Sequence, residues 1–203
     1  MATEIEMKFN VPSHRAVARR LRQLRARRLY TAVQRDRYFD TPQHRLLKAD
    51  CGLRLRETRC LRAGTERPEL RTLLTFKGPR RGRSAAKVRA EHQTFLDEPA
   101  LMGEIFTACG LTGMLTIEKK RSSFRLGRCK VELDELPLLG CFVEIEGPAE
   151  AAVQAVREKL GLETALPLKD HYIGLARAAC RRLGRQCREM TFANCQSCRR
   201  GGK

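Results

Sequence analysis

The sequence contains no tryptophan and few other aromatic residues, with three tyrosines and eight phenylalanines in 203 positions. Proteins that bind single-stranded nucleic acids stack bases on exposed aromatic rings, so this scarcity argues against such a platform. No apolar run approaches the roughly 20 residues that a transmembrane helix needs. The N-terminus is acidic and then polar, unlike a secretory signal peptide. The sequence therefore predicts a cytoplasmic location and no membrane partner.

Histidine and cysteine patterns typical of zinc sites are also scarce. His14, His44, His92 and His171 are isolated, and we interpret each as structural or solvent-exposed. The nine cysteines are expected to be free thiols, as in a reducing compartment. The last pair near the C-terminus has C-x-x-C spacing, but the longer gaps match no common zinc module, so a reduced, flexible segment is favoured over a zinc site. The cysteines concerned are Cys180, Cys187, Cys195 and Cys198.

Positive charge is abundant. Lysine and arginine number 41 against 23 aspartates and glutamates, a formal net charge of +18. This imbalance implies an anionic partner, which could be nucleic acid, membrane or polyphosphate. The arginine-rich segment 15–28 is interpreted as a solvated helix face, so any binding of nucleic acid is expected to be non-specific. The oligomeric state is left open.

Eight segments alternate between apolar and polar residues with period two, as strands with two different faces do. Helical patterns separate several of them, which gives an α+β class. Antiparallel strands joined by short links favour closure into an eight-stranded β-barrel tunnel with helices packed outside, because closure removes exposed edges. The expected strands are residues 2–9, 29–40, 52–60, 70–78, 87–96, 114–126, 128–135 and 141–147.

The hydrophobic content of 42% supports one domain with a real core, which we assign to residues 1–183. From residue 184 the chain becomes basic and poor in apolar residues. Residues 184–203 are therefore predicted to form a flexible, cysteine-containing tail outside the core.

One face of nearly every predicted strand carries charge. A charged face in water over an apolar face under helices is the common explanation for a single strand. Here, however, cations gather on the middle strands and carboxylates on the first and last, which would be neighbours in a closed barrel. Four carboxylates would then lie beside a lining of lysine and arginine: Glu4, Glu6, Glu144 and Glu146.

This arrangement suits phosphate chemistry. Clustered carboxylates without histidine or cysteine are typical ligands of Mg²⁺ or Mn²⁺. Arginine and lysine match the charge of a triphosphate, and phosphoryl transfer depends mainly on positioning and charge neutralisation. A second metal ion would assist the attacking or leaving oxygen, so two ions are expected. The inward cations are Lys8, Arg54, Arg56, Lys77, Arg89, Lys119 and Arg121.

Several motifs occur together in an order that resembles the CYTH superfamily, the triphosphate tunnel metalloenzymes. The pattern ExExK stands at residues 4–8 and is weak alone, but the remaining motifs follow it in the family's order across residues 2–180. They are YFDTP at 38–42, LRLRE at 53–57, TFKGP at 75–79, RAE at 89–91, KKR at 119–121, LDELPLLG at 133–140 and FVEIEG at 142–147.

The resemblance implies an eight-stranded tunnel, dependence on Mg²⁺ or Mn²⁺ and a triphosphate substrate. It assigns metal binding to the four carboxylates above, with Asp134 as a further candidate, and phosphate binding to the seven inward cations. Lys169 is a weaker match, because the region before the last helix varies in length. Glu91 is interpreted either as a metal ligand or as a residue that orients an arginine.

The family includes triphosphatases and class IV adenylate cyclases, which share the tunnel. We favour hydrolysis of inorganic, thiamine or nucleoside triphosphate, because water is the easier nucleophile to place. The candidate partners are ATP, tripolyphosphate and thiamine triphosphate. Conversion of ATP to cyclic AMP and pyrophosphate is the alternative within the family. A non-catalytic polyphosphate- or nucleotide-binding module is the alternative from another class, which the retained carboxylates disfavour.

Overall fold

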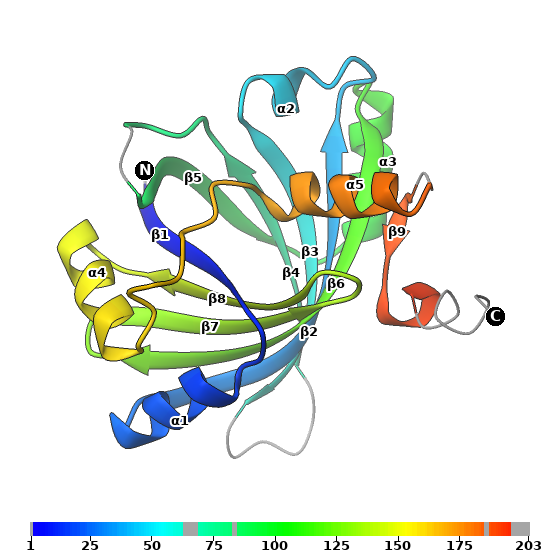
Figure 1. Cartoon of the computed structure of the whole chain (residues 1–203). Helices are drawn as coiled ribbons and strands as arrows, with labels where there is room; N and C mark the ends of the chain where they lie inside the picture. Colours follow the sequence, from blue (N-terminus) through cyan, green and yellow to red (C-terminus); the bar gives the residue numbers. More distant parts are fainter. Residues whose placement is uncertain (1, 63–68, 83–84, 185–186, 196–203) are drawn as a thin grey trace.

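A computed structural model describes residues 2–62, 69–82, 85–184 and 187–195 (Figure 1). Eight antiparallel strands close into a barrel, because β2 pairs with both β3 and β6 at the two ends of the strand order. The predicted α+β barrel with outer helices is confirmed. The strands are β1 Ala2–Val11, β2 Arg27–Asp40, β3 Gly52–Arg62, β4 Glu69–Lys77, β5 Lys87–Leu96, β6 Thr112–Leu126, β7 Cys129–Leu136 and β8 Gly140–Glu146.

The ring order is β2-β3-β4-β5-β1-β8-β7-β6, so the first strand lies between the fifth and the eighth. Glu6 is the register partner of Glu146, and Lys8 is the partner of Glu144. The expected adjacency of the first and last strands is therefore confirmed. It follows from a long connection through the first helix, which carries the chain from β1 across the barrel to β2.

The helices pack outside the barrel, where the apolar faces of the strands lie. Phe9, Val131 and Ile145 are fully buried beneath Leu21 and Val153, which come from two different helices. An ordinary small barrel has this polarity reversed, with apolar side chains inside. No helix in the described part of the chain is long and apolar enough to cross a membrane. The helices are α1 Arg15–Gln23, α2 Arg45–Lys48, α3 Pro99–Ala108, α4 Glu150–Lys159 and α5 Tyr172–Arg182.

Part of the expected tail packs on the barrel. A short strand, β9 Glu189–Met190, pairs in parallel with β6, and Met190 is completely buried beside Ile117. Residues 187–195 thus differ from the expectation of a segment outside the core. Their few apolar side chains gave no periodic signal, yet Met190 and Cys195 are buried, and Phe192 N donates to Glu118 Oε2 at 2.8 Å. Residues 185–186 and 196–203 lie outside the described residues, and the domain limit at residue 183 stays a prediction.

The same segment corrects the expectation of free thiols at two positions. Cys180, at the end of α5, and Cys187 form a disulfide. The two cysteines are seven positions apart in the sequence, a spacing that did not indicate the pairing. Neither is therefore available as a zinc thiolate in this state, and Cys198 lies outside the described residues.

Candidate active site

The inward faces of the barrel strands surround a cavity of about 280 Å³. Its wall carries nine cations and six carboxylates, so the cations are in excess. Strand alternation places them there, because every second side chain of a strand faces the inside of the barrel. The cations are Lys8, Arg54, Arg56, Lys77, Lys87, Arg89, Lys119, Arg121 and Lys130. The carboxylates are Glu4, Glu6, Glu91, Glu132, Glu144 and Glu146.

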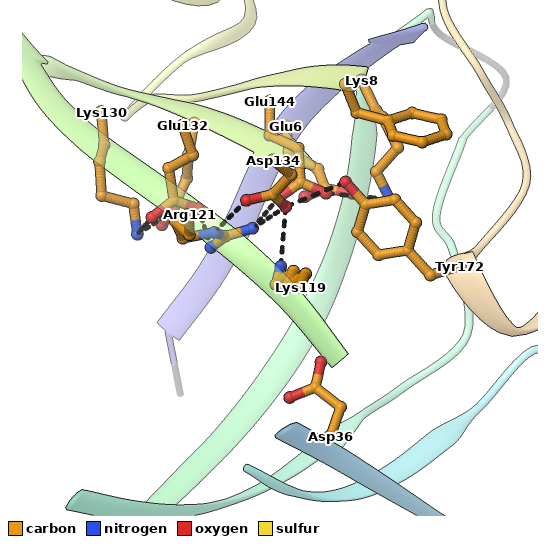
Figure 2. A network of polar contacts seen from close by, with 12 residues as sticks. Glu6, Lys8, Asp36, Lys119, Arg121, Lys130, Glu132, Asp134, Glu144 and Tyr172 are labelled. Atoms are coloured by element: carbon orange, nitrogen blue, oxygen red, sulfur yellow. Dashed lines mark hydrogen bonds and ion pairs between the residues drawn. The ribbon is translucent and has the colours of Figure 1, made fainter. Parts of the chain in front are cut away.

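Arg121 on β6 is the centre of a paired network on one side of the tunnel (Figure 2). Its Nε donates to Oδ1 of Asp134 at 2.6 Å, and its Nη2 donates to Oδ2 of the same carboxylate at 2.5 Å. Nη2 also contacts Oε2 of Glu144 at 2.5 Å, and Nη1 contacts Glu132. Arg121 and Asp134 are register partners on β6 and β7, so the strand pairing itself brings them together.

Asp134 accepts two further hydrogen bonds. Lys119 Nζ and Tyr172 Oη both donate to its Oδ2, at 2.8 and 3.0 Å. Burial, followed by the positive charge of Arg121, lowers the pKa of Lys119 to about 8. Tyr172 comes from the start of α5, and Lys8 Nζ lies 3.8 Å from its ring centroid (Figure 2). Asp134 is completely buried and does not line the cavity, so here it holds cations in place.

Each of the four carboxylates predicted to bind metal contacts a lysine. Glu4 accepts from Lys77 Nζ at 2.6 Å, and Glu144 pairs with Lys8 Nζ at 3.0 Å. The pairs made by the other two carboxylates are Glu6–Lys87 at 3.4 Å and Glu146–Lys130 at 2.6 Å.

The donor chemistry of these carboxylates fits a hard divalent cation. Burial and the charge of Glu144 act to raise the pKa of Glu6, but neighbouring lysines lower it below its ordinary value, so Glu6 is ionised near neutral pH. Burial likewise opposes ionisation of Glu144, yet Lys8 and Arg121 hold its pKa well below the ordinary value. Among the described residues no three acidic, histidine or cysteine side chains converge on one point. A bound ion would therefore replace some of the lysine contacts.

On the opposite side of the tunnel, fewer of the positive charges are paired with carboxylates. Asp36 on β2 accepts from Arg56 Nε and Nη2 at 2.6 and 2.7 Å, but Arg54 Nη1 lies 3.5 Å from it. Arg54 Nε and Arg89 Nη2 are buried without a hydrogen-bond partner. Arg89 is 3% exposed and forms no ion pair with any carboxylate in the part of the chain described. Such an unpaired buried cation is costly unless an anionic ligand contacts it.

Residues 168–171 form a strap that crosses one end of the tunnel before α5 begins (Figure 1). His171 Nε2 lies 2.9 Å from Oδ1 of Asp50, and Arg80 Nε donates to Oδ2 of Asp50 at 2.8 Å. Arg80 Nη1 also donates to the carbonyl of Lys169 at 2.8 Å. These contacts tie the strap to the loops that precede β3 and β5.

The structure brings nearly all the predicted site residues to one cavity. All seven cations, the four carboxylates and Glu91 line it. Asp134 lies behind the wall, and the side chain of Lys169 is not part of the lining. Their roles in binding stay predictions.

Sequence reasoning missed several residues in or beside the cavity wall. Lys87 and Lys130 follow the same alternation as the charged residues two positions away, which could have indicated them. Asp36 and Tyr172 gave no such signal, because their partners come from distant strands. His171 was interpreted as isolated, yet it lines the cavity and contacts a residue 121 positions away in the sequence.

The sequence model of the CYTH domain matches residues 2–171, and the chain belongs to this family. Membership implies an enzyme of the adenylate cyclase and triphosphatase type that depends on a divalent metal. One relative is the protein named "Putative adenylate cyclase MJ0240" of Methanocaldococcus jannaschii. It is 24% identical over 143 residues, which cover 70% of this chain and 75% of the relative.

Solved structures share the fold. The protein PH1819 of Pyrococcus horikoshii OT3 has a TM-score of 0.71 at 22% identity, covering 86% of this chain and 98% of its own. The Hippeastrum protein "Putative adenylyl cyclase HpAC1", described as having a dominant triphosphatase activity, has a TM-score of 0.65 at 17% identity. That match covers 90% of this chain and 97% of the Hippeastrum chain.

Proposed function

We propose that this chain is a divalent-metal-dependent triphosphatase that hydrolyses a phosphoanhydride bond of inorganic, thiamine or nucleoside triphosphate inside the tunnel. One observation carries the proposal: Arg89 is almost wholly buried in the cavity wall, has no ion pair among the described residues, and leaves Nη2 without a partner. A phosphate oxygen would supply both the missing charge and the missing acceptor.

The other cations would extend this site along a phosphate chain. Arg54 offers its unpartnered Nε and its weakly held guanidinium. Lys8 and Lys119 lie beside the ring of Tyr172, at 3.8 and 5.1 Å from its centroid, which limits their movement. Groups held in this way stabilise developing charge on transferred phosphoryl oxygens without having to reorganise. The protein would therefore contribute mainly binding, orientation and charge neutralisation.

The metal would be held by oxygen ligands from β1 and β8. We assign this role to Glu4, Glu6, Glu144 and Glu146, with Mg²⁺ or Mn²⁺ as the ion and two ions as the expected number. When bound, the metal would neutralise phosphate charge and favour attack at phosphorus. The lysines that contact these carboxylates would then be released toward the substrate, because each loses its ion-pair partner.

Cyclisation of ATP is the second candidate, favoured by the printed name of the Methanocaldococcus relative. Against it, the lining offers few rings for stacking an adenine. Among the described lining residues these are Tyr38, His171 and Tyr172. Tyr172 already faces Lys8 and packs edge-on against Phe142, with the ring centroids 5.3 Å apart. The activity described for the Hippeastrum protein also favours hydrolysis.

The test is incubation with ATP, tripolyphosphate or thiamine triphosphate plus Mg²⁺ or Mn²⁺, with chromatographic separation of the products. Orthophosphate or a diphosphate product supports the proposal. Cyclic AMP with pyrophosphate would establish the cyclase instead, and tight binding without turnover would establish a non-catalytic module.

Two variants test the metal site in the same assay. Glu4→Gln and Glu146→Gln should each abolish most turnover while the protein remains folded, because each removes one ligand charge from the site. Glu135→Gln is the matched control, since Glu135 is exposed on the outer face of β7. Near-normal activity of both site variants would show that the metal binds elsewhere.

A further inference from the structure

A second cationic region lies on the outer surface, at the end of the barrel where α1 packs. The chain has no aspartate or glutamate between residues 7 and 35, and none between residues 119 and 131. The pairing of β2 with β6 brings these two acid-free stretches side by side. They present nine exposed arginines, which we call the arginine surface: Arg15, Arg19, Arg20, Arg22, Arg25, Arg27, Arg28, Arg125 and Arg128.

Carboxylates of the described residues do not neutralise the positive charges of the arginine surface. No ion pair joins any of its nine members to a carboxylate in the residues that the structure describes. Arg125 Nη1 donates only to the carbonyl of Arg128, at 3.2 Å. In Figure 1, α1 and the start of β2 lie at the end of the barrel away from α2 and α5, so the surface is separate from the strap.

The local arrangement of these charges is unfavourable for the protein alone. Arg27 is the register partner of Arg125, so two arginines lie directly opposite each other on adjacent strands. Like charges directly opposite on a sheet destabilise it. On α1, Arg15 and Arg19 are four residues apart, where like charges also repel, and no acidic residue occupies the first turn. A polyanion bound across this surface would relieve both repulsions.

The composition of the surface points to phosphate groups. Every exposed cation in residues 15–28 and in the turn region 125–128 is an arginine, whose planar guanidinium matches phosphate oxygens in pairs, as a lysine ammonium does not. Insertion into a membrane is disfavoured, because the apolar residues Val17 and Leu21 of α1 are buried in the core. Base stacking is disfavoured as well, because Tyr30 and Phe124 beside the surface are half-buried. The ligand that still fits is a nucleic acid with a regular array of phosphates and with its bases paired.

We propose that the arginine surface binds the phosphodiester backbone of a nucleic-acid duplex, without sequence preference and independently of the tunnel. The surface provides charge and donors to phosphate but no group arranged to read bases. Binding of this kind depends steeply on salt, because each neutralised phosphate releases counterions.

The test uses the full chain and a DNA duplex of about 20 base pairs, with affinity measured by fluorescence anisotropy across a salt series. The triple variant Arg15→Gln, Arg19→Gln, Arg22→Gln should weaken binding at least about tenfold. It should also lower the slope of log affinity against log salt by about three, one for each lost phosphate contact. Replacement of the same three by lysine should preserve most of the slope.

Matched controls separate the surface from net charge and from the tunnel. The triple variant Arg59→Gln, Arg181→Gln, Arg182→Gln removes the same charge from exposed arginines elsewhere and should leave the slope nearly unchanged. Arg89→Met should leave duplex binding unaffected. Equal losses in the two triple variants would mean that net charge alone binds the duplex, and the proposal would be wrong.

A second pair of changes protects the test against a folding defect in α1. Arg125→Gln with Arg128→Gln alters the β6–β7 turn instead and should lower the slope by about two. Circular dichroism establishes that each variant is folded. The proposal would also be overturned by failure to bind duplex at about 0.1 M salt. Tighter binding to vesicles containing anionic lipids than to the duplex would overturn it in favour of a membrane surface.

Discussion

The two sides of the tunnel carry the same kinds of residue but differ in how many of their positive charges are paired with carboxylates. On the side formed by β6, β7 and β8, Arg121 contacts three carboxylates. On the side formed by β3 and β5, Arg89 contacts none of the described carboxylates, and Arg54 approaches Asp36 only to 3.5 Å. Both arginines, Arg121 and Arg89, are nevertheless about equally buried, at 5% and 3% exposure.

This difference separates structural charge from functional charge. A buried cation with several carboxylate partners contributes to the fold, and removal of one partner is strongly destabilising. A buried cation without partners lowers the stability of the fold, and such a cation is retained where an anionic ligand pairs with it. The paired side therefore fixes the shape of the tunnel. We expect the closest phosphate contacts on the other side, with Lys119 adding positive charge from the paired side.

Asp134→Asn tests the paired side and should have the largest effect. It leaves Lys119 and Arg121 without their shared carboxylate in a site closed to water. The free energy of unfolding should fall by about 3–5 kcal/mol, as for other broken buried ion pairs. Urea unfolding monitored by circular dichroism measures this loss. The control is Glu135→Gln at an exposed position, which should change the free energy of unfolding by no more than about 0.5 kcal/mol. A loss below about 1 kcal/mol would remove the distinction between the two sides.

Arg89→Met tests the unpaired side, with the opposite sign. The stability of the unliganded protein should stay the same or rise, because an uncompensated buried charge is removed. The affinity for tripolyphosphate should fall ten- to a hundredfold, since a charge-assisted hydrogen bond contributes about 1.5–3 kcal/mol. Thermal shift with and without ligand measures both quantities, and Arg59→Met on the outer face of β3 is the control. An unchanged ligand shift would contradict the assignment of this side to phosphate.

The pH dependence of binding provides a third test, because the pKa of Lys119 lies at about 8, lowered by burial and by Arg121. Below pH 8 the lysine is charged and attracts phosphate; as the pH rises through 8 the charge is lost and affinity decreases. At pH 6.5, Lys119→Met should weaken tripolyphosphate binding by about tenfold, which corresponds to about 1.4 kcal/mol. Above pH 9 the same substitution should hardly change the affinity. Comparison of the two proteins by calorimetry cancels the titration of the ligand itself. A constant difference across this range would show that Lys119 does not titrate there.

Tyr172→Phe should have the smallest effect. It removes one hydrogen bond to Asp134 but retains the ring beside Lys8 and Phe142. Because Asp134 keeps its two cationic donors, we expect a loss of about 0.5–1.5 kcal/mol in stability. Tyr172→Leu should cost more, since the ring contacts are also lost. Equal losses in urea unfolding for the two variants would mean that the ring contacts contribute nothing.

Strand alternation explains how much of this architecture was predictable. Period two places Glu4, Glu6 and Lys8 on one face whatever their neighbours are, so the inward charge of each strand followed from the sequence. The partner of each charge did not. The family resemblance made Asp134 a further candidate for metal binding, and only the register of β6 against β7 shows that it lies opposite Arg121. Pairing across strands depends on tertiary register, which alternation leaves open.

The end of the chain was the least predictable part. Met190 is a single apolar residue in a polar stretch, and its burial depends on a parallel pairing with β6 that no local pattern signals. Tyr172 begins α5 and packs against Phe142, yet its hydroxyl reaches the charged interior. Both cases show tertiary contacts overriding what a short window of sequence can indicate.

The pairing of β2 with β6 sets how a ligand can reach the site. Each strand of the ring is hydrogen-bonded on both sides, so the width of the passage depends on strand number and tilt rather than on a hinge between lobes. A molecule must therefore enter along the axis, and the wall does not close around it. A linear chain of phosphates, as proposed above, would lie along this axis, and a bulky group attached to that chain would stay near one end of the barrel.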